Sequence, residues 1–203
     1  MDYQEQILNF LQQPENLPVA LEVARQVEAL RPHMHRLFWD DISHAINTRL
    51  SQSSFPDRWA ISSAGDFDRP YRNLTIRSRI VPDSFKGSIL VVGLIQHRPP
   101  SYQLQYGLLW SPKDRPAPDC PTFRKLMDLS QKAGAPEKNQ DFWWPANNLV
   151  NIFLRSDEFM LQYGLNRQEF IDNLADKIWS YFTTLELTLY EFNQELFQGQ
   201  WAV

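Results

Sequence analysis

The stretch from Pro82 to Arg98 comes nearest to a catalytic pattern in this sequence. Asp83 precedes an almost wholly apolar run, residues 88–96, and Gln96 and Arg98 stand at the end of that run. A divalent cation such as Mg²⁺ prefers carboxylate oxygens, so Asp83 and a second acid would form a site for metal-dependent hydrolysis. The amide of Gln96 carries no charge, however, and the guanidinium of Arg98 cannot release a proton. These residues therefore predict a plain turn and a strand end, and Mg²⁺ binding is kept only as an alternative.

A broader pattern of aromatic-rich segments runs through residues 34–197. It consists of a helical segment 36–41, the lone Trp59, Pro82-Asp83 ahead of an apolar strand, the segments 102–108 and 142–144, and a long terminal helix. In this order the segments resemble the C-terminal region of PD-(D/E)XK nuclease-like families of unknown function. The resemblance implies a link to nucleic acid or to phage defence. It carries over no catalytic residue, because Gln96 occupies the place of the family's second acid and Arg98 the place of its lysine.

Arginines on a predicted sheet face indicate a binding surface. Residues 74–80 alternate between apolar and polar, which is typical of a half-buried strand and places Arg77 and Arg79 on its outer face. Trp59 is expected near them, and Arg98 adds to the same basic stretch. Arginines beside aromatic rings bind single-stranded nucleic acid or an acidic protein surface. The simpler interpretation is a solvated face whose charges prevent aggregation through the sheet edge.

Two adjacent tryptophans, Trp143 and Trp144, precede Pro145. Neighbouring side chains of an extended chain point in opposite directions, so one ring is expected to be exposed where a partner can contact it. A lid over the core is the simpler interpretation of the pair.

Asp40 and His44 are four residues apart in a predicted helix and therefore share a face. Such a pair is found among metal ligands. No third ligand is evident in the neighbouring sequence, and the pair predicts a solvated helix face. The sequence therefore predicts no metal site.

Helical spacing of apolar residues marks the first part of the chain. Residues 2–12, 16–30 and 34–50 each predict a helix, separated by breaks at Pro14 and Pro32. A proline inside a helix lacks the N–H that the helical ladder needs. We therefore expect three separate helices here.

Residues 166–197 predict one long amphipathic helix. Its apolar residues recur at steps of three or four, and Asn166 with Glu169 forms the pattern of a capping box. Such a helix is about 48 Å long at 1.5 Å per residue. A helix of that length either lies across a sheet or reaches out to a partner, including a second copy of the chain.

Between these helical parts the hydrophobic period changes from helix to strand. Strands are predicted within residues 59–63, 74–80, 88–96, 102–108 and 149–154, with a helix at 122–132. The connections among the first four of these strands are too short for parallel crossovers, so these strands are expected to form an antiparallel meander, within an antiparallel sheet of about five strands. The fold class is α+β, in a single domain of three parts: helical residues 1–50, sheet residues 59–154 and the long helix 166–197.

The composition and net charge of the chain argue against several classes of function. The net charge of −4 argues against a general nucleic-acid binder, and the lone Cys120 cannot form an internal disulfide. No window approaches the ~20 apolar residues of a membrane span. We expect a cytoplasmic protein without a membrane contact and without a cofactor.

These observations favour a non-catalytic interaction module that binds a protein or a nucleic acid. The expected binding residues are Arg77, Arg79, Arg98, Trp59, Trp143 and Trp144. Self-association through residues 166–197 is expected to give a homodimer. The alternative is a divergent metal-dependent nuclease that uses Asp83.

Overall fold

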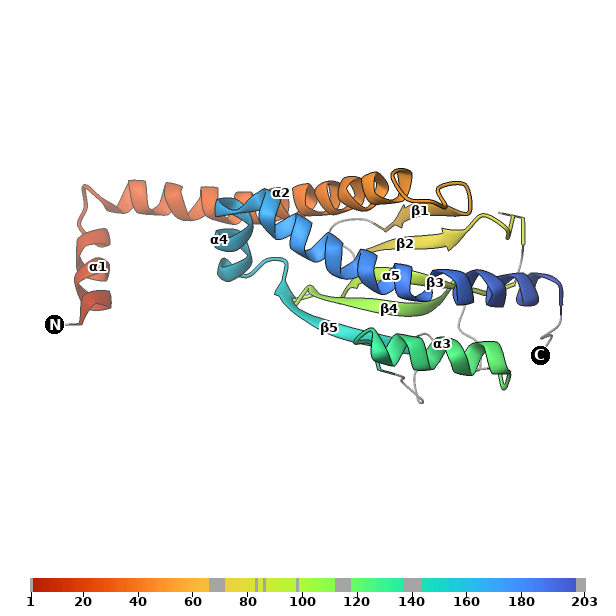
Figure 1. Ribbon diagram of the computed structural model, residues 1–203. Helices are drawn as coiled ribbons and strands as arrows, with labels where there is room; N and C mark the ends of the chain where they lie inside the picture. The colour runs from red at the N-terminus through yellow and green to blue at the C-terminus, as the bar shows by residue number, and fades with distance from the viewer. Residues whose placement is uncertain are drawn as a thin grey trace.

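The computed structural model describes residues 2–65, 72–82, 84–85, 87–97, 99–111, 118–136 and 144–199. Two helices and four strands come first: α1 (Tyr3–Leu11), α2 (Leu17–Ser51), β1 (Trp59–Ala64), β2 (Asn73–Ser78), β3 (Ile89–Gln96) and β4 (Gln103–Ser111). They are followed by α3 (Pro121–Lys132), β5 (Ala146–Phe153), α4 (Asp157–Leu165) and α5 (Arg167–Phe197), as Figure 1 shows. This arrangement confirms the predicted α+β class.

The five strands form one antiparallel sheet in the order β1-β2-β3-β4-β5. Each strand pairs with the next strand along the chain, which confirms the predicted meander. The register between β2 and β3 joins only Asn73–Ile76 to Val92–Ile95. The first residues of β3 therefore lie beyond the paired part of β2.

One face of the sheet is covered by three helices that lie side by side, with α2 contacting β1, α5 contacting β3 and α3 contacting β5. The sheet residues that face these helices alternate along each strand. They include Trp59, Leu74, Ile76, Leu90, Val92, Leu94, Leu104, Tyr106, Leu108 and Trp110. The main hydrophobic core is formed between these two layers.

The opposite face of the sheet carries a smaller apolar cluster. Its buried members are Val81, Ile89, Val91, Ile95, Leu109 and Trp144. β3 contributes to both clusters and is buried over its whole length. This agrees with the prediction of a central strand from its unbroken apolar run.

α5 is an unbroken helix of 31 residues, and it lies across the sheet as predicted. Its apolar stripe is buried at Leu174, Ile178, Phe182, Leu185, Leu189, Phe192 and Leu196. The predicted capping box is wrong, because the side chain of Asn166 makes no capping hydrogen bond. Asn166 also closes α4, with its N–H donating to the carbonyl of Gln162, and its φ of −130° and ψ of 43° differ from the extended N-cap conformation.

α2 is one helix of 35 residues, so the predicted break at Pro32 is wrong. Contacts beside the proline hold the helix to the rest of the protein. Arg31 donates from Nη1 to the carbonyl of Arg155 at 2.6 Å and from Nη2 to Asp157 at 2.5 Å. These contacts fasten α2 to the segment before α4 at the residue that directly precedes Pro32. Buried residues of α2 begin at Met34, so its first half lies outside the core.

Candidate functional site

Gln96 lies inside the protein, between β3 and α2. Its side chain is fully buried and points to the same face of the sheet as the core residues of β3. Gln96 Oε1 lies 2.7 Å from His35 Nε2 and accepts from Trp39 Nε1 at 3.0 Å. The side chain thus joins the central strand to α2 and is covered by that helix. His35 was not among the predicted site residues.

Arg155 contacts the edge of this buried hydrogen-bond network. Its Nε donates to Nδ1 of His35 at 3.4 Å, so Nδ1 is the acceptor and Nε2 carries the proton that His35 donates to Gln96. The guanidinium lies over the ring of Tyr102, 4.4 Å from its centroid. Tyr102 has a φ of 45°, a left-handed conformation that costs a non-glycine residue about 1–2 kcal/mol. The contacts of its ring with Arg155 and with His35 hold it there.

The remaining two residues of the catalytic pattern, Asp83 and Arg98, lie outside the described residues. Pro82 precedes β3 and Gln96 ends it, and the eight residues of this strand span about 23 Å at 3.3 Å per residue. In the part of the chain that the structure describes, no three His, Cys, Asp or Glu side chains are grouped to hold a metal. The nuclease alternative stays a prediction.

The two arginines predicted to form a sheet-face surface make local contacts. Arg77 is half-buried, and its Nη2 donates to the carbonyl of Val81 at 3.4 Å. Arg79 is exposed just beyond β2, and its Nε donates to the carbonyl of Trp59 at 2.7 Å. The prediction that Trp59 is a binding residue is wrong, because its ring is fully buried and its Nε1 donates to Glu186 at 2.8 Å.

Trp144 is also buried, at 2% exposure, and belongs to the smaller apolar cluster. Its assignment as a contact residue is therefore wrong, and the simpler interpretation as a lid over the core holds for this ring. Trp143 lies outside the described residues.

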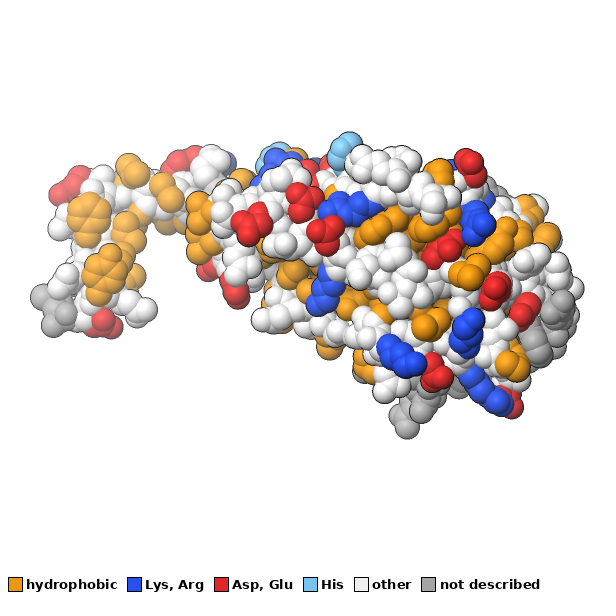
Figure 2. All heavy atoms as spheres, in the orientation of Figure 1, with side chains coloured by type: hydrophobic (Ala, Val, Ile, Leu, Met, Phe, Trp, Pro, Cys, Tyr) orange, Lys and Arg blue, Asp and Glu red, His pale blue; other side chains and the backbone are white. Residues whose placement is uncertain are grey.

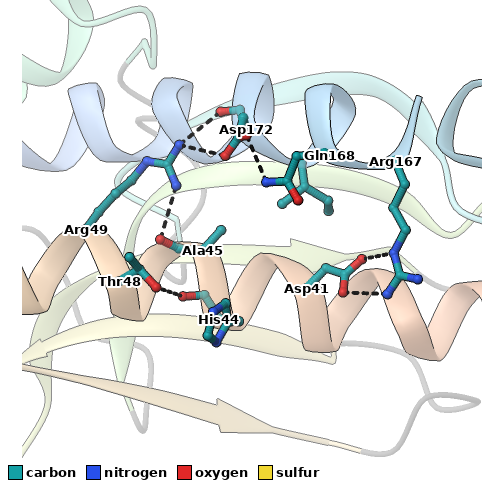
Figure 3. A pocket seen from close by; sticks show the side chains of 9 residues that line it. Asp41, His44, Ala45, Thr48, Arg49, Arg167, Gln168 and Asp172 are labelled. Atoms are coloured by element: carbon teal, nitrogen blue, oxygen red, sulfur yellow. Dashed lines mark hydrogen bonds and ion pairs between the residues drawn. The ribbon is translucent and has the colours of Figure 1, made fainter.

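An open groove of about 570 Å³ lies between α2 and α5, and Figure 3 shows its lining. His44 lines this groove, and Asp40 is exposed nearby on α2. On one side Arg167 donates to both oxygens of Asp41, at 2.6 and 2.7 Å. On the other side Arg49 donates to Asp176 at 2.7 Å and to Asp172. Opposite charges thus pair across the groove and hold the two helices together.

Asp41 links the groove to the pH dependence of stability. The hydrogen bonds from Arg167 hold the pKa of Asp41 below its ordinary value, burial opposes this, and the hydrogen bond from Tyr163 adds to the lowering. A carboxylate with a lowered pKa in the folded state stabilises the protein above its unfolded pKa of about 3.9. That contribution is lost as the pH falls through the folded pKa.

Asp41→Asn is therefore expected to lower the free energy of unfolding by about 1–2 kcal/mol at pH 7, because the half-exposed ion pair is lost. The difference from the wild type should be smaller at about pH 2, below the ordinary pKa of the carboxyl, because protonation progressively removes the ion pair. Urea unfolding at both pH values measures this. Asp176→Asn, at a more exposed ion pair, is the control and should change stability by less than about 0.5 kcal/mol. An equal loss at both pH values would contradict the assignment.

Many exposed apolar side chains lie on the segment that extends away from the sheet and its covering helices. We call residues 3–30 the arm, and the described residues from Met34 onward the body. Ten large apolar side chains of the arm are 38–74% exposed: Tyr3, Ile7, Leu8, Phe10, Leu17, Val19, Leu21, Val23, Val27 and Leu30. Figure 2 shows these hydrophobic groups spread over α1 and the start of α2. Together they expose roughly 1,000 Å² over more than one face of the arm, because Leu17 and Leu21 lie on the opposite side of α2 from Val23.

The arm gains little stability from the body. α1 has nine residues, none of them buried, and isolated helices shorter than about 12 residues are marginal in water. The turn after α1 is held by Asn16, whose Nδ2 donates to the carbonyl of Phe10 at 3.0 Å. The apolar side chains of the arm are therefore covered only if another surface meets them. Sequence periodicity revealed both helices but could not show that the body leaves them uncovered.

The arm also carries the net charge of the protein. Residues 1–30 contain five acidic residues and one basic residue, a net charge of −4, which equals the formal charge of the whole chain. The remaining residues hold equal numbers of the two signs. An acidic surface repels phosphates, so the arm does not suit nucleic acid.

The chain matches no protein-family model, no curated protein and no solved structure. Across the described residues, every helix falls short of the length and apolar character that crossing a bilayer requires. The candidate site is therefore inferred from the structure alone. Most of the exposed large apolar side chains among the described residues belong to the arm.

Proposed function

We propose that this protein is a non-catalytic interaction module whose arm binds another protein. The single observation that carries the proposal is the set of ten exposed apolar side chains on α1 and the first half of α2. An amphipathic helix that presents such a face is a common element of protein recognition. The body serves as the rigid support from which the arm extends.

The other surfaces support this choice over nucleic-acid binding. Arg77 and Arg79 each donate to a nearby carbonyl, and the aromatic ring predicted beside them, Trp59, is buried. Stacking platforms for bases need exposed rings. The acidic arm offers a protein partner apolar contacts at its centre with charges around them, which is the usual layout of a protein interface.

The proposal is tested by placing a photo-reactive phenylalanine analogue at position 19 in the arm and irradiating cells that naturally make the protein. Val19 is 64% exposed, so the analogue leaves the fold unchanged. We expect one discrete covalent adduct, which disappears when Val23→Glu, on the same face of α2 as position 19, is added to the same chain.

The matched control carries the analogue at position 187, where Leu187 is 56% exposed on α5 of the body. It should give no discrete adduct. The absence of any adduct from position 19, or the same adducts from both positions, would refute the arm as the binding element. The mass of the adduct also tells whether the partner is a different protein or a second copy.

A further inference from the structure

The apolar stripe that α2 carries in the body has counterparts in the arm, on the far side of Arg31. Ala20, Ala24 and Val27 fall within the same arc of about 80° around the helix as the buried Phe38 and Ile42. In the body this stripe packs against α5 and β1. In the arm the same stripe has no covering element from the body. Both halves of α2 therefore carry apolar residues on this side, but only the second half is buried within the chain.

An open notch lies beside the first half of α2. Figures 1 and 2 show α1 turning down from the start of α2 on one side of this notch and α4 standing on the other. Leu161 and Leu165 are 62% and 78% exposed on α4, opposite its buried residues Phe159 and Tyr163. The stretch of α2 above the notch, residues 17–30, is about 20 Å long, which admits one further helix of about 10 Å diameter.

The faces of the arm that would enter such a notch are free of charge. Val19, Val23, Val27 and Leu30 lie within about 80° of one another on α2, and no acidic or basic residue falls inside that arc. Glu22 lies outside the arc and is paired with Arg25 at 2.7 Å. A partner helix against this face needs no basic residues. It needs only another apolar face of similar length.

The arm itself carries an apolar face of this kind and length. Resting on the proposed function, we infer that the partner is a second copy of this chain, with the arm of each copy lying in the notch of the other. Most homo-oligomers are two-fold dimers in which the same patch contacts itself. The roughly 1,000 Å² exposed on each arm matches the ~800 Å² that one partner contributes to a stable interface. The arrangement differs from a dimer through α5, whose apolar stripe is buried in the body.

Sedimentation equilibrium of the purified full chain tests the inference. The wild type should sediment with about twice the mass of the 23.9 kDa chain. Val23→Glu is expected to raise the dissociation constant at least tenfold, because it places a charge in the middle of each contact. Glutamate suits a helix, so the helix content of the variant should stay that of the wild type.

Leu187→Glu is the matched control, because Leu187 and Val23 are both 56% exposed. The control variant should dimerise like the wild type. Salt provides a second readout. Two arms that each carry a net charge of −3 repel each other, so raising the salt concentration should tighten this dimer, whereas it would weaken binding to a basic partner.

Three outcomes would overturn the inference. The chain could sediment as a monomer up to about 0.1 mM, Val23→Glu could leave the dimer intact, or Leu187→Glu could disrupt it. A monomeric chain that still gives an adduct of another mass from position 19 would refute the second copy and leave the proposed function standing. A monomeric chain without any adduct would refute both.

Discussion

Replacing Gln96 by leucine is expected to lower the free energy of unfolding by about 3 kcal/mol. Leucine has a similar size but accepts no hydrogen bond. His35 Nε2 and Trp39 Nε1, which lie 2.7 and 3.0 Å from the Gln96 oxygen, would stay buried without an acceptor. Each buried donor left unpaired costs roughly 1–3 kcal/mol, and some relaxation of the two rings reduces the sum.

Urea unfolding followed by tryptophan fluorescence measures this loss. Gln131→Leu, on the exposed side of α3, is the control and should change stability by less than about 0.5 kcal/mol. Unchanged stability in Gln96→Leu would mean that the side chain does not lie under α2. It would then be open to solvent, as the metal-site alternative requires, so the same measurement bears on both interpretations of the residue.

The position of Gln96 could not be predicted because its strand is buried on both faces. Alternation of apolar and polar residues assigns a strand's inner face, and β3 shows no alternation. One signal was available in α2. His35 and Trp39 are four residues apart on the stripe that also holds Phe38 and Ile42, so two donors enter the core together and need an acceptor there. A glutamine at the end of an apolar strand can provide that acceptor.

The sheet itself was predictable because its determinants are local. The connections from β1 to β4 are too short for parallel crossovers, and all five strands follow one another in the sequence. The continuity of α2 was not predictable, because it depends on the contacts of Arg31 with Arg155 and Asp157 beyond the proline. Such contacts join residues more than a hundred positions apart, and no local pattern encodes them.

The role of Cys120 shows a similar limit. The sequence alone showed only that this lone cysteine cannot form an internal disulfide. In the structure it is fully buried at the start of α3, where its Sγ accepts from the N–H of Phe123 at 3.4 Å. Serine, threonine, aspartate and asparagine are the usual N-cap residues. The thiol fills this role in a position that is too apolar for a charged cap.

Asn193 carries the second large effect, because it completes the pairing of the central strand. Leu90 lies on β3 beyond the stretch that pairs with β2. Asn193 Oδ1 accepts from the N–H of Leu90 at 3.0 Å, and Nδ2 donates to the carbonyl of Leu90 at 2.8 Å. The side chain of α5 thus provides both hydrogen bonds that a neighbouring strand would otherwise form. Asn193 is fully buried, so water cannot replace it.

Asn193→Ala should therefore lower the free energy of unfolding by about 3 kcal/mol, since two buried backbone groups lose their partners and a small cavity opens. Asn47→Ala is the matched control, because the Asn47 amide contacts only a carbonyl of its own helix at the surface. Its effect should stay below about 0.5 kcal/mol. Urea unfolding gives both values, and hydrogen exchange should show faster exchange of the Leu90 amide in Asn193→Ala alone. Equal stability of the two variants would contradict the role of Asn193.

The variant Asn193→Asp distinguishes the contributions of the two hydrogen bonds, because the protonation state of its carboxyl changes with pH. The ionised carboxylate still accepts from the N–H of Leu90 but cannot donate to its carbonyl, and it brings a charge into the core. A protonated carboxyl can do both. The folded state therefore raises the pKa of the new carboxyl, so the variant should recover stability relative to wild type as the pH falls from 7 to 5. No recovery over that range would mean that the side chain swings out to solvent, and that α5 holds β3 through apolar packing alone.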